Sequence, residues 1–453
     1  MTFPRISVLL ILGIMVFTSC KKETFITSPN ALLSTSVDSL MFDTVFTTAG
    51  SITKQFKIFN LNNQKLRVSV SLKGGSASPF KINVDGIASP SVNNIEIAAN
   101  DSIYVFVQVN VNPNSATAPF ILADTISINY NGNNAIVPLQ AYGQNANFMR
   151  CAEITNDTTW SSTLPFVILC QLKIDSGKTL TLQHGCRIYV HADAPILVDG
   201  TLLANGIKTD SIVFRGDRLD PDYKDLPASW PGIYFRTTSI NNAMVFAEVR
   251  NAYNGIVVAN PPSNLNPKLT LSKCIIDNTY QTGLFADNTS IVADNCLISN
   301  CGQNIRLLTG GNYSFYNCTV VSYGDVFIDH KYPVLDIENL ISGGASFTNC
   351  IFWGDNGNVT DEINLVSNSA PLTFTNILYK GTPPPNAINS VTGDPSFDSV
   401  NVVKPYFDFH INAHPNTIIL DAGTTTLFPI DLDGFMRMNN AGDPPDLGCY
   451  EKK

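Results

Sequence analysis

The sequence has little charge and lacks the residue runs that build long helices. Only 14% of its 453 residues are charged, and no long tracts rich in alanine, glutamate, lysine and leucine occur. The hydrophobic fraction of 44% argues against a disordered chain. Asparagine, serine and threonine are abundant, and they favour strands and turns over helices. The length exceeds one ordinary domain, so we expect two or three.

Basic clusters are also missing, which excludes one class of partner. The formal net charge is −9, and no run of more than two basic residues occurs. Nucleic-acid binding needs a basic surface that displaces counterions from phosphates. We therefore expect no nucleic-acid partner.

The N-terminus predicts export. Arg5 is followed by an apolar run, residues 8–17, that is too short to span a bilayer as a stable helix. Small residues then precede Cys20. This arrangement resembles a bacterial lipoprotein signal, in which residues 1–19 are removed and Cys20 is acylated. The alternative is an ordinary secretory signal with an incidental cysteine.

On the lipoprotein prediction, acyl chains on Cys20 anchor the protein in the outer membrane of a Gram-negative bacterium. It would face either the periplasm or the cell surface, and residues 20–35 would form a tether. Nine further cysteines would then sit in an oxidising compartment that permits disulfides. Because nine is odd, at least one thiol stays unpaired within the chain, and the pairing itself is left open.

Residues 36–145 alternate apolar and polar positions in short segments separated by turn-forming residues. Seven strands are predicted at residues 55–61, 65–72, 80–86, 94–100, 102–111, 123–130 and 135–143. Seven strands without a helical pattern predict an antiparallel β-sandwich. The layout, and residues 59–72 (FNLNNQKLRVSVSL) in particular, resemble the hydin-like immunoglobulin folds. That resemblance implies a spacer or interaction module and no active site.

After Arg150 the period changes to a repeat of 22 residues. Residues 268–289, 290–311 and 312–333 align without gaps, and Cys274, Cys296 and Cys318 fall in one column. A fixed period indicates a solenoid whose coils bury their apolar face by stacking. The coils contain short strands broken by Asn, Gly and Asp, so we predict a parallel β-helix over residues 150–400, with roughly ten or eleven coils at the strand spacing of stacked sheets.

The cysteine column has two interpretations. Stacked strands lie about 4.8 Å apart, which permits disulfides by distance, but parallel Cβ vectors suit the S–S torsion poorly. Free thiols that pack as small buried hydrophobes are the favoured interpretation. Cys350 follows Cys318 at 32 residues, which predicts one coil plus a ten-residue insertion. Asn278 and Asn300 share another column, where asparagine suits a bend.

These coils resemble the right-handed parallel β-helix of the pectate-lyase-like superfamily. The tail, residues 401–453, resembles the closing signature of the bacterial choice-of-anchor β-helix family. It retains Asp421-Ala422-Gly423, Asp431-Leu432-Asp433-Gly434, Arg437 and residues 446–451 (DLGCYE), but it lacks the family's serine-proline and one alanine. The predicted fold class is therefore all-β, an immunoglobulin-like sandwich followed by this β-helix. The resemblance implies acidic polysaccharide bound along one sheet, cleaved by Ca²⁺-dependent lyases or by hydrolases with paired aspartates.

Three groups of residues are candidates for chemistry. The first is the loop 215–230, where carboxylates would ligate Ca²⁺ and two rings would stack on a sugar. Its members are Asp217, Arg218, Asp220, Asp222, Tyr223, Asp225 and Trp230. The alternative is a solvated insertion covering a coil edge.

The second group combines acid, base and imidazole. The 22-residue register places Asp287 and Lys331 in one column and Arg306 one position from Asp329 and His330. Such groups on one exposed strip would serve a lyase, although ordinary exposed sheet charges explain them equally.

The third group is Asp431, Asp433, Asp443 and Asp446 in the tail. Asp431 and Asp433 belong to an Asp-x-Asp-Gly motif typical of Ca²⁺ loops, but the later glutamate of an EF-hand is missing. The alternative is that these acids close the last coil by accepting its free backbone N–H groups.

Polygalacturonase-type hydrolases carry an Asn-x-Asp, a paired Asp-Asp and a Gly-His-Gly on successive coils. The single Asn-x-Asp in this sequence is Asn83-Val84-Asp85 in the predicted sandwich, and the other two motifs are absent, which counts against such a hydrolase. Three hypotheses remain. The protein binds polysaccharide or another extracellular partner without catalysis, or it is a lyase or glycoside hydrolase acting on an acidic glycan, or it is an adhesin.

Overall fold

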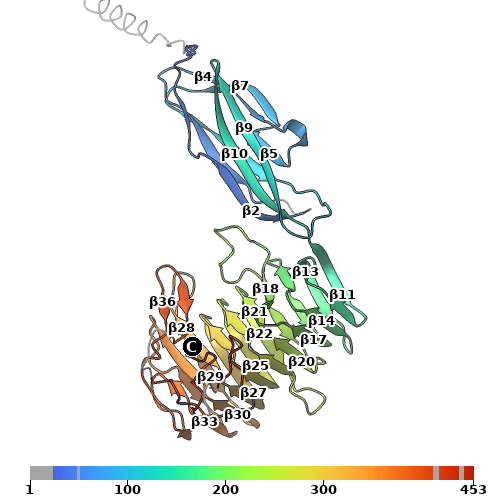
Figure 1. Ribbon diagram of the computed structural model, residues 1–453, viewed down its shortest axis with the longest axis vertical. Helices are drawn as coiled ribbons and strands as arrows, with labels where there is room; N and C mark the ends of the chain where they lie inside the picture. Colours follow the sequence, from blue (N-terminus) through green and yellow to red (C-terminus); the bar gives the residue numbers. More distant parts are fainter. Residues whose placement is uncertain (1–23, 48–50, 412–417, 438–442, 453) are drawn as a thin grey trace, which may run out of the picture. The chain divides into compact units, whose positions relative to one another are not determined.

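The computed structural model describes residues 24–47, 51–411, 418–437 and 443–452. Its regular structure is nearly all strand, and the chain divides into two compact units, Met1–Gln144 and Asn145–Lys453 (Figure 1). The predicted signal, residues 1–19, and Cys20 lie outside the described residues. Within the described part of the chain, no helix is long and apolar enough to cross a membrane.

The first unit is a sandwich of two five-stranded sheets, as the alternating sequence predicts. One sheet has the order β1-β3-β8-β5-β6 and the other β2-β10-β9-β4-β7. The strands are β1 (Leu33–Thr35), β2 (Leu40–Phe46), β3 (Lys54–Asn60), β4 (Leu66–Leu72), β5 (Phe80–Val84), β6 (Ile87–Ala88), β7 (Ser91–Ile97), β8 (Ser102–Val109), β9 (Phe120–Tyr130) and β10 (Asn133–Gln144). A short 3-10 helix, Gly75–Ala77, follows β4. Alternate side chains of the long strands fill one core, for example in β8, where every second residue is buried.

The predicted tether needs correction. Residues 24–35 pack on the sandwich: Leu33–Thr35 form the edge strand β1 against β3, and Ala31 is buried. Phe25 bridges to Lys65, whose N–H donates to the Thr24 carbonyl over 3.1 Å. The sequence prediction also missed β2, because apolar residues adjoin at both of its ends, Leu40–Phe42 and Val45–Phe46, and break the alternation. β2 pairs in parallel with β10, whereas most neighbours in this unit are antiparallel.

The second unit is a parallel β-helix. Each strand pairs in parallel with the strand one coil later, so the strands form three stacked sheets (Figure 1). Sheet 1 contains β12, β14, β17, β20, β23, β30, β33 and β35; sheet 2 contains β15, β18, β21, β24, β26, β28, β31 and β34; sheet 3 contains β16, β19, β22, β29 and β32. Strands β11 and β13 belong to sheets 2 and 3, whereas β25 and β27 begin in sheet 3 and continue into sheet 1. Ten strands stack in sheet 1, within the predicted number of coils.

The strand bounds of this unit follow. They are β11 (Asn147–Ile154), β12 (Thr158–Trp160), β13 (Phe166–Ile174), β14 (Thr179–Gln183), β15 (Arg187–Val190), β16 (Ile196–Val198), β17 (Thr201–Asn205), β18 (Ile212–Gly216), β19 (Ile233–Phe235), β20 (Asn242–Val245), β21 (Ala247–Arg250), β22 (Asn254–Ala259), β23 (Leu269–Ser272), β24 (Ile275–Asp277), β25 (Thr282–Asp294), β26 (Leu297–Ser299), β27 (Gln303–Tyr316), β28 (Thr319–Tyr323), β29 (Leu335–Glu338), β30 (Gly343–Thr348), β31 (Ile351–Asp355), β32 (Ile363–Val366), β33 (Leu372–Thr375), β34 (Leu378–Tyr379) and β35 (Ala387–Ile388). A hairpin of β36 (Ser399–Asn401) and β37 (Tyr406–Asp408) follows.

The predicted 22-residue register is confirmed. Leu269 pairs with Ile291 and Ile291 with Tyr313, one coil apart each time. Cys274, Cys296, Cys318 and Cys350 are free thiols, fully buried in the interior at the same point of successive coils. The favoured interpretation of the cysteine column is therefore confirmed.

Asparagine marks the corners of the coil. A left-handed backbone with φ near +50° recurs just before each of the four stacked cysteines, at Asn295, Asn317 and Asn349 and, before Cys274, at Lys273. It recurs after sheet 2 at Asn278 and Asn300. Asparagine tolerates this conformation better than most residues, because its short polar side chain can hydrogen-bond locally. Neighbouring corners are also joined, since the Asn349 amide donates to the Asn317 side-chain oxygen over 2.8 Å.

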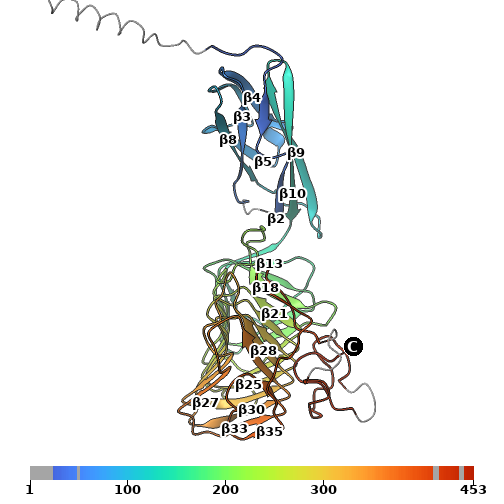
Figure 2. The same ribbon diagram turned by 90° about the vertical axis from the view of Figure 1, so that its left-hand side faces the viewer.

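The tail lies against the side of the helix rather than over its last coil. Outward residues of sheet 2, including Leu297, Val321 and Ile351, form one buried cluster with Leu432 and Leu447 of the tail. Strand β28 is consequently buried on both faces. Figure 2 shows the tail, in dark red, beside several coils. The expectation that the tail closes the final coil is therefore wrong, because sheet 2 has an apolar outer face that the tail must cover.

The one disulfide among the described residues joins the first coils. Cys151 in β11 and Cys170 in β13 are bonded, with their Cα atoms 5.0 Å apart and both residues exposed. The two strands change register at this point, between Arg150 and Ala152. The other seven cysteines that follow Cys20 are free and buried.

Candidate functional site

A ten-residue insertion lies at the centre of the candidate site. The insertion loop, residues 324–334, leaves sheet 2 after β28 and enters sheet 3 at β29, and it lengthens this coil to 32 residues between Phe315 and Phe347. Two cavities of the β-helix unit share Phe327 of this loop in their lining. We call them the tyrosine cavity and the tail cavity.

The tyrosine cavity opens on sheet 3 and has a volume of about 600 Å³. Its lining comprises Tyr253, Tyr280, Gln281, Thr282, Gly302, Gln303, Arg306, Phe327, Ile328, Asp329, Lys331, Tyr332, Pro333, Asp336, Glu338 and Asn364. Aromatic rings and hydrogen-bonding side chains therefore surround one hollow, the composition of a site that binds a small polar ligand with apolar faces.

Two tyrosines on consecutive coils form a platform at one end of this cavity. The rings of Tyr253 and Tyr280 stack with centroids 5.7 Å apart and planes at 30°. Both side chains stay exposed, at 43% and 53%. Each tyrosine follows a left-handed corner asparagine by two residues, Asn251 and Asn278 respectively. The corners therefore fix the rings one above the other.

An arginine and two carboxylates form the floor. Arg306 on β27 lies over Asp336 on β29, with an Nε–Oδ2 distance of 3.5 Å, and its Nη2 donates to Glu338 at 3.3 Å. Asp336 also accepts from the amides of Gln303 at 2.8 Å and Asn364 at 2.7 Å. Burial, together with the neighbouring Glu338 carboxyl, raises the pKa of Asp336 above its ordinary value. The two carboxylates point to the same side of their strand, because they are two residues apart.

The insertion loop supplies the outer wall and is fastened from beneath. Asp329 and Lys331 form an exposed ion pair, 2.6 Å between Oδ2 and Nζ. Between them His330 turns inward, and its Nε2 lies 2.8 Å from the buried carboxylate of Glu362. The other oxygen of Glu362 accepts the N–H of Val334 at 3.2 Å. The pair therefore fixes both the middle and the end of the loop.

The second candidate group is reassigned in part. Arg306, Asp329 and Lys331 line the tyrosine cavity, but His330 is buried beneath the loop and not on an exposed strip. The predicted column of Asp287 and Lys331 is wrong, because Asp287 lies beside Leu308 and that position continues to Glu338. The insertion displaces Lys331 from the 22-residue register. The Asp287 carboxylate accepts instead from the Thr309 hydroxyl.

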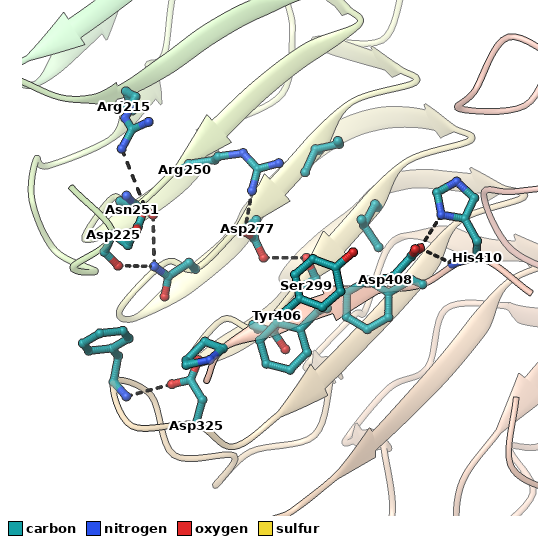
Figure 3. A pocket seen from close by; sticks show the side chains of 18 of the residues that line it. Arg215, Asp225, Arg250, Asn251, Asp277, Ser299, Asp325, Tyr406, Asp408 and His410 are labelled. Carbon is teal, nitrogen blue, oxygen red and sulfur yellow. Dashed lines mark hydrogen bonds and ion pairs between the residues drawn. The ribbon is translucent and has the colours of Figure 1, made fainter. Parts of the chain in front are cut away.

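The tail cavity opens on sheet 2 and has a volume of about 400 Å³. One wall is an outward column of residues at the same place in successive coils, Arg250, Asp277 and Ser299 (Figure 3). The opposite wall is residues 405–410 of the tail, including Tyr406, which is 62% exposed. Arg250 donates to Asp277 at 2.8 Å, and Ser299 donates to the same carboxylate at 2.7 Å.

The first candidate group folds back on the coil. Trp230 is fully buried and donates its indole N–H to the Arg250 carbonyl at 2.9 Å, so it cannot stack on a sugar. Asp220 is buried against Arg218, whose guanidinium covers the ring of Tyr223 at 3.9 Å. The other three aspartates of this group lie in different surroundings from one another.

Asp217 accepts from His191 at 2.7 Å, Asp225 lines the tail cavity, and Asp222 is exposed at the loop surface. The predicted Ca²⁺ ligands therefore do not converge. Across the described ranges, no group of three or more acidic, histidine or cysteine side chains is placed to hold a metal ion.

The third candidate group is structural. Asp431 is fully buried and accepts the backbone N–H groups of Phe435 at 2.7 Å and Glu451 at 2.9 Å. Asp433 contacts Lys208 and lies 3.0 Å from His410 Nε2. The acids therefore satisfy donors of the tail itself and one lysine on the coil, not the N–H groups of a last coil.

Sequence reasoning missed the tyrosine platform and the Asp336–Glu338 pair. A signal for the platform was present, since Asn-x-Tyr occurs at 251–253 and again at 278–280, one coil apart. The carboxylates had no such signal, because the insertion that precedes them breaks the repeat. Tyr406 was also missed, since only folding brings the tail onto sheet 2.

The fold defines this protein as a parallel β-helix protein that carries an antiparallel β-sandwich. No protein-family model matches the sequence, and no curated protein matches it either.

Several solved structures share partial likeness. One is a family 123 glycoside hydrolase from Clostridium perfringens, with 10% identity and a TM-score of 0.20, covering 26% of this chain and 30% of that one. Another is the catalytic domain of a GH87 alpha-1,3-glucanase in complex with tetrasaccharides, with 10% identity and a TM-score of 0.22, covering 73% and 91%.

The YadV chaperone is similar at 11% identity and a TM-score of 0.18, covering 24% of this chain and 50% of that one. The complex of SafA pilin with the SafB chaperone from Salmonella enterica matches at 15% identity and a TM-score of 0.18, covering 25% and 55%. The chain thus spans less than two thirds of the length of three of these four structures. At such scores the likeness carries no argument about activity.

Proposed function

We propose that this protein binds a neutral glycan in the tyrosine cavity. The observation that carries the proposal is the exposed stack of Tyr253 and Tyr280 beside a floor of hydrogen-bonding groups. A sugar ring has an apolar C–H face, which suits an aromatic platform, and a rim of hydroxyls, which suits amides and carboxylates. Gln281, Gln303 and Asn364 supply amides around the rim.

The charges favour a neutral ligand over the acidic glycan of the sequence hypothesis. Among the described residues that line the cavity, both cations have acidic partners: Arg306 is held by Asp336 and Glu338, and Lys331 by Asp329. An anionic sugar would have to displace these carboxylates or lie beside them. A neutral hydroxyl meets no such repulsion.

Hydrolysis in the same cavity is a second candidate. Asp336 and Glu338 are two residues apart on one strand, so their Cα atoms lie about 6.6 Å apart, and burial raises the pKa of Asp336. Two carboxyl groups beside one cavity are the groups that glycoside hydrolases use, and a raised pKa is the direction that a general acid requires.

The proposal includes a place in the cell envelope, anchored through acylated Cys20. An exposed disulfide between Cys151 and Cys170 supports this location, because such bonds persist in oxidising compartments. An adhesin would use the same location, and glycan binding would then serve attachment.

The test is binding of neutral oligosaccharides to the purified protein without its signal, measured by calorimetry after an array of glycans identifies a ligand. We expect Tyr253→Ala/Tyr280→Ala to weaken binding by at least about tenfold, since aromatic anchors dominate such contacts. The control is Tyr104→Ala/Phe106→Ala, which removes a similar exposed stack, with centroids 5.9 Å apart, from the sandwich.

Unchanged binding in the cavity variant, or equal loss in the sandwich variant, contradicts the proposed site. The same incubations, analysed for new reducing ends, decide between binding and hydrolysis. Turnover that disappears in Asp336→Asn supports the second candidate, whereas binding without products supports the first.

A further inference from the structure

The two cavities meet at one corner of the coil. Asn278 lines the tail cavity and Tyr280 the tyrosine cavity; one coil later, Asn300 lines the former and Gly302 the latter. Two residues span at most about 7 Å of backbone. Only the buried corner residue, Thr279 or Cys301, separates the two sets of lining residues.

The insertion loop crosses the same corner. Asp325 lines the tail cavity, Ile328 lines the tyrosine cavity, and Phe327 lines both. The Phe327 side chain is 40% exposed. Asp325 accepts the N–H groups of Phe327 and Ile328 at 2.8 and 2.9 Å, which fixes the loop where it passes between the cavities. A ligand that lies on Phe327 therefore reaches both hollows.

The chemistry of the two cavities also agrees. Arg250 in the tail cavity is held by Asp277 and by Glu248, its Nε lying 3.0 Å from Glu248 Oε2, so its charge is balanced like that of Arg306. Tyr406 offers an exposed ring, and the exposed carboxylate of Asp225 lines the same cavity. An exposed aromatic ring beside polar side chains and paired charges therefore occurs in each of the two cavities that Phe327 lines. Figure 3 shows the tail cavity.

We infer that the tyrosine cavity and the tail cavity are two parts of one site, and that the ligand is an oligosaccharide that crosses the corner over Phe327. The inference rests on the proposed function and adds a length requirement to it. A short sugar fills the tyrosine cavity alone, and each further unit that passes Phe327 adds contacts with Tyr406 and its neighbours. The tail thus contributes to recognition as well as covering sheet 2.

The experiment is a chain-length series of the neutral glycan found on the array, from monosaccharide to octasaccharide, titrated by calorimetry into the wild type and into Tyr406→Ala. Tyr406 is exposed and lies outside the tyrosine cavity, so its loss leaves the shorter ligands unaffected. We expect Tyr406→Ala to weaken the longest oligosaccharide about tenfold and the disaccharide by less than about twofold. Phe327→Ala weakens the long ligands as well. Tyr142→Ala, an exposed tyrosine of the sandwich, is the matched control.

Wild-type affinity that continues to rise as the chain grows beyond the disaccharide, with that later increase lost in Tyr406→Ala, supports the inference. Affinity that levels off at the disaccharide, with Tyr406→Ala silent and Tyr253→Ala/Tyr280→Ala still defective, overturns the inference and leaves the proposed function standing. If the folded wild-type protein binds the glycan at no chain length, the proposed function and the inference are overturned together.

Discussion

Single polar residues hold the corners and loops of the β-helix. Lys268 is fully buried, and its ammonium donates to three backbone carbonyls, those of Ala259 at 2.6 Å, Asn260 at 3.0 Å and Thr237 at 3.2 Å. These carbonyls belong to two loops of neighbouring coils. One side chain therefore satisfies acceptors that the strands leave unpaired.

We expect replacement of this lysine to lower the stability of the protein. In Lys268→Met the three carbonyls lose their donor, so we expect the free energy of unfolding at pH 7 to fall by about 3 kcal/mol. Urea unfolding followed by circular dichroism measures this. Lys404→Met, at an exposed position, is the control and changes little.

The same residue predicts a pH effect. Burial lowers the pKa of Lys268 from 10.5 to about 8. Between those values the unfolded chain binds more protons than the folded one, so the contribution of this group to stability rises with pH through that window. The wild type should therefore gain stability relative to Lys268→Met from pH 8 to pH 10. A constant difference between the two proteins would contradict this assignment.

At the scale of elements, the first strand of the solenoid has a covalent clamp. β11 has β13 as its neighbour, and the Cys151–Cys170 bond joins the two where their register changes. An inner strand forms backbone hydrogen bonds with a neighbouring strand on each of its two edges, whereas an outermost strand forms them on one edge only. The clamp therefore lies where hydrogen bonding alone is weakest.

Removal of the clamp should destabilise the β-helix unit. The bond closes a loop of 19 residues, for which constraint of the unfolded chain contributes about 3 kcal/mol. We expect Cys151→Ser/Cys170→Ser to lower the free energy of unfolding by that amount, measured by urea titration. Wild-type protein treated with dithiothreitol should behave like the variant. Retention of full stability in both would show that the strand is held by other contacts.

At the scale of the whole molecule, each unit has a core of its own. Alternating strands of the sandwich enclose one apolar cluster, and stacked coils enclose the other. The proposed lipid anchor would attach this two-unit chain to a membrane through Cys20.

The anchor predicts where the protein is found in cells. Cys20→Ala, which removes the acylated thiol, should shift the protein from the membrane fraction to the soluble fraction, since acyl chains contribute about 0.8 kcal/mol per buried CH₂. Fractionation and immunoblotting measure the change. Cys301→Ala, which alters a buried cysteine of the β-helix, is the control. Membrane association that survives in Cys20→Ala contradicts the lipoprotein proposal.

The sequence by itself determined the fold, because the residues that build it repeat. Alternation specified most strands of the sandwich, and the 22-residue period of Leu269, Ile291 and Tyr313 specified a coil in which equivalent side chains stack. The corner asparagines and the cysteine column follow from the same period. Each of these features depends on neighbours that are near in sequence or one repeat away.

Only the tertiary structure decided the site. The insertion loop breaks the period, so the register could not place Lys331 or His330, nor reveal Arg306 over Asp336. The tail carries Tyr406 onto sheet 2 from more than 100 residues away along the chain, and Trp230 looked like a sugar platform until burial placed it inside. A repeat predicts what lies one coil apart, but contacts made by an insertion or a tail depend on which apolar surface remains to be covered.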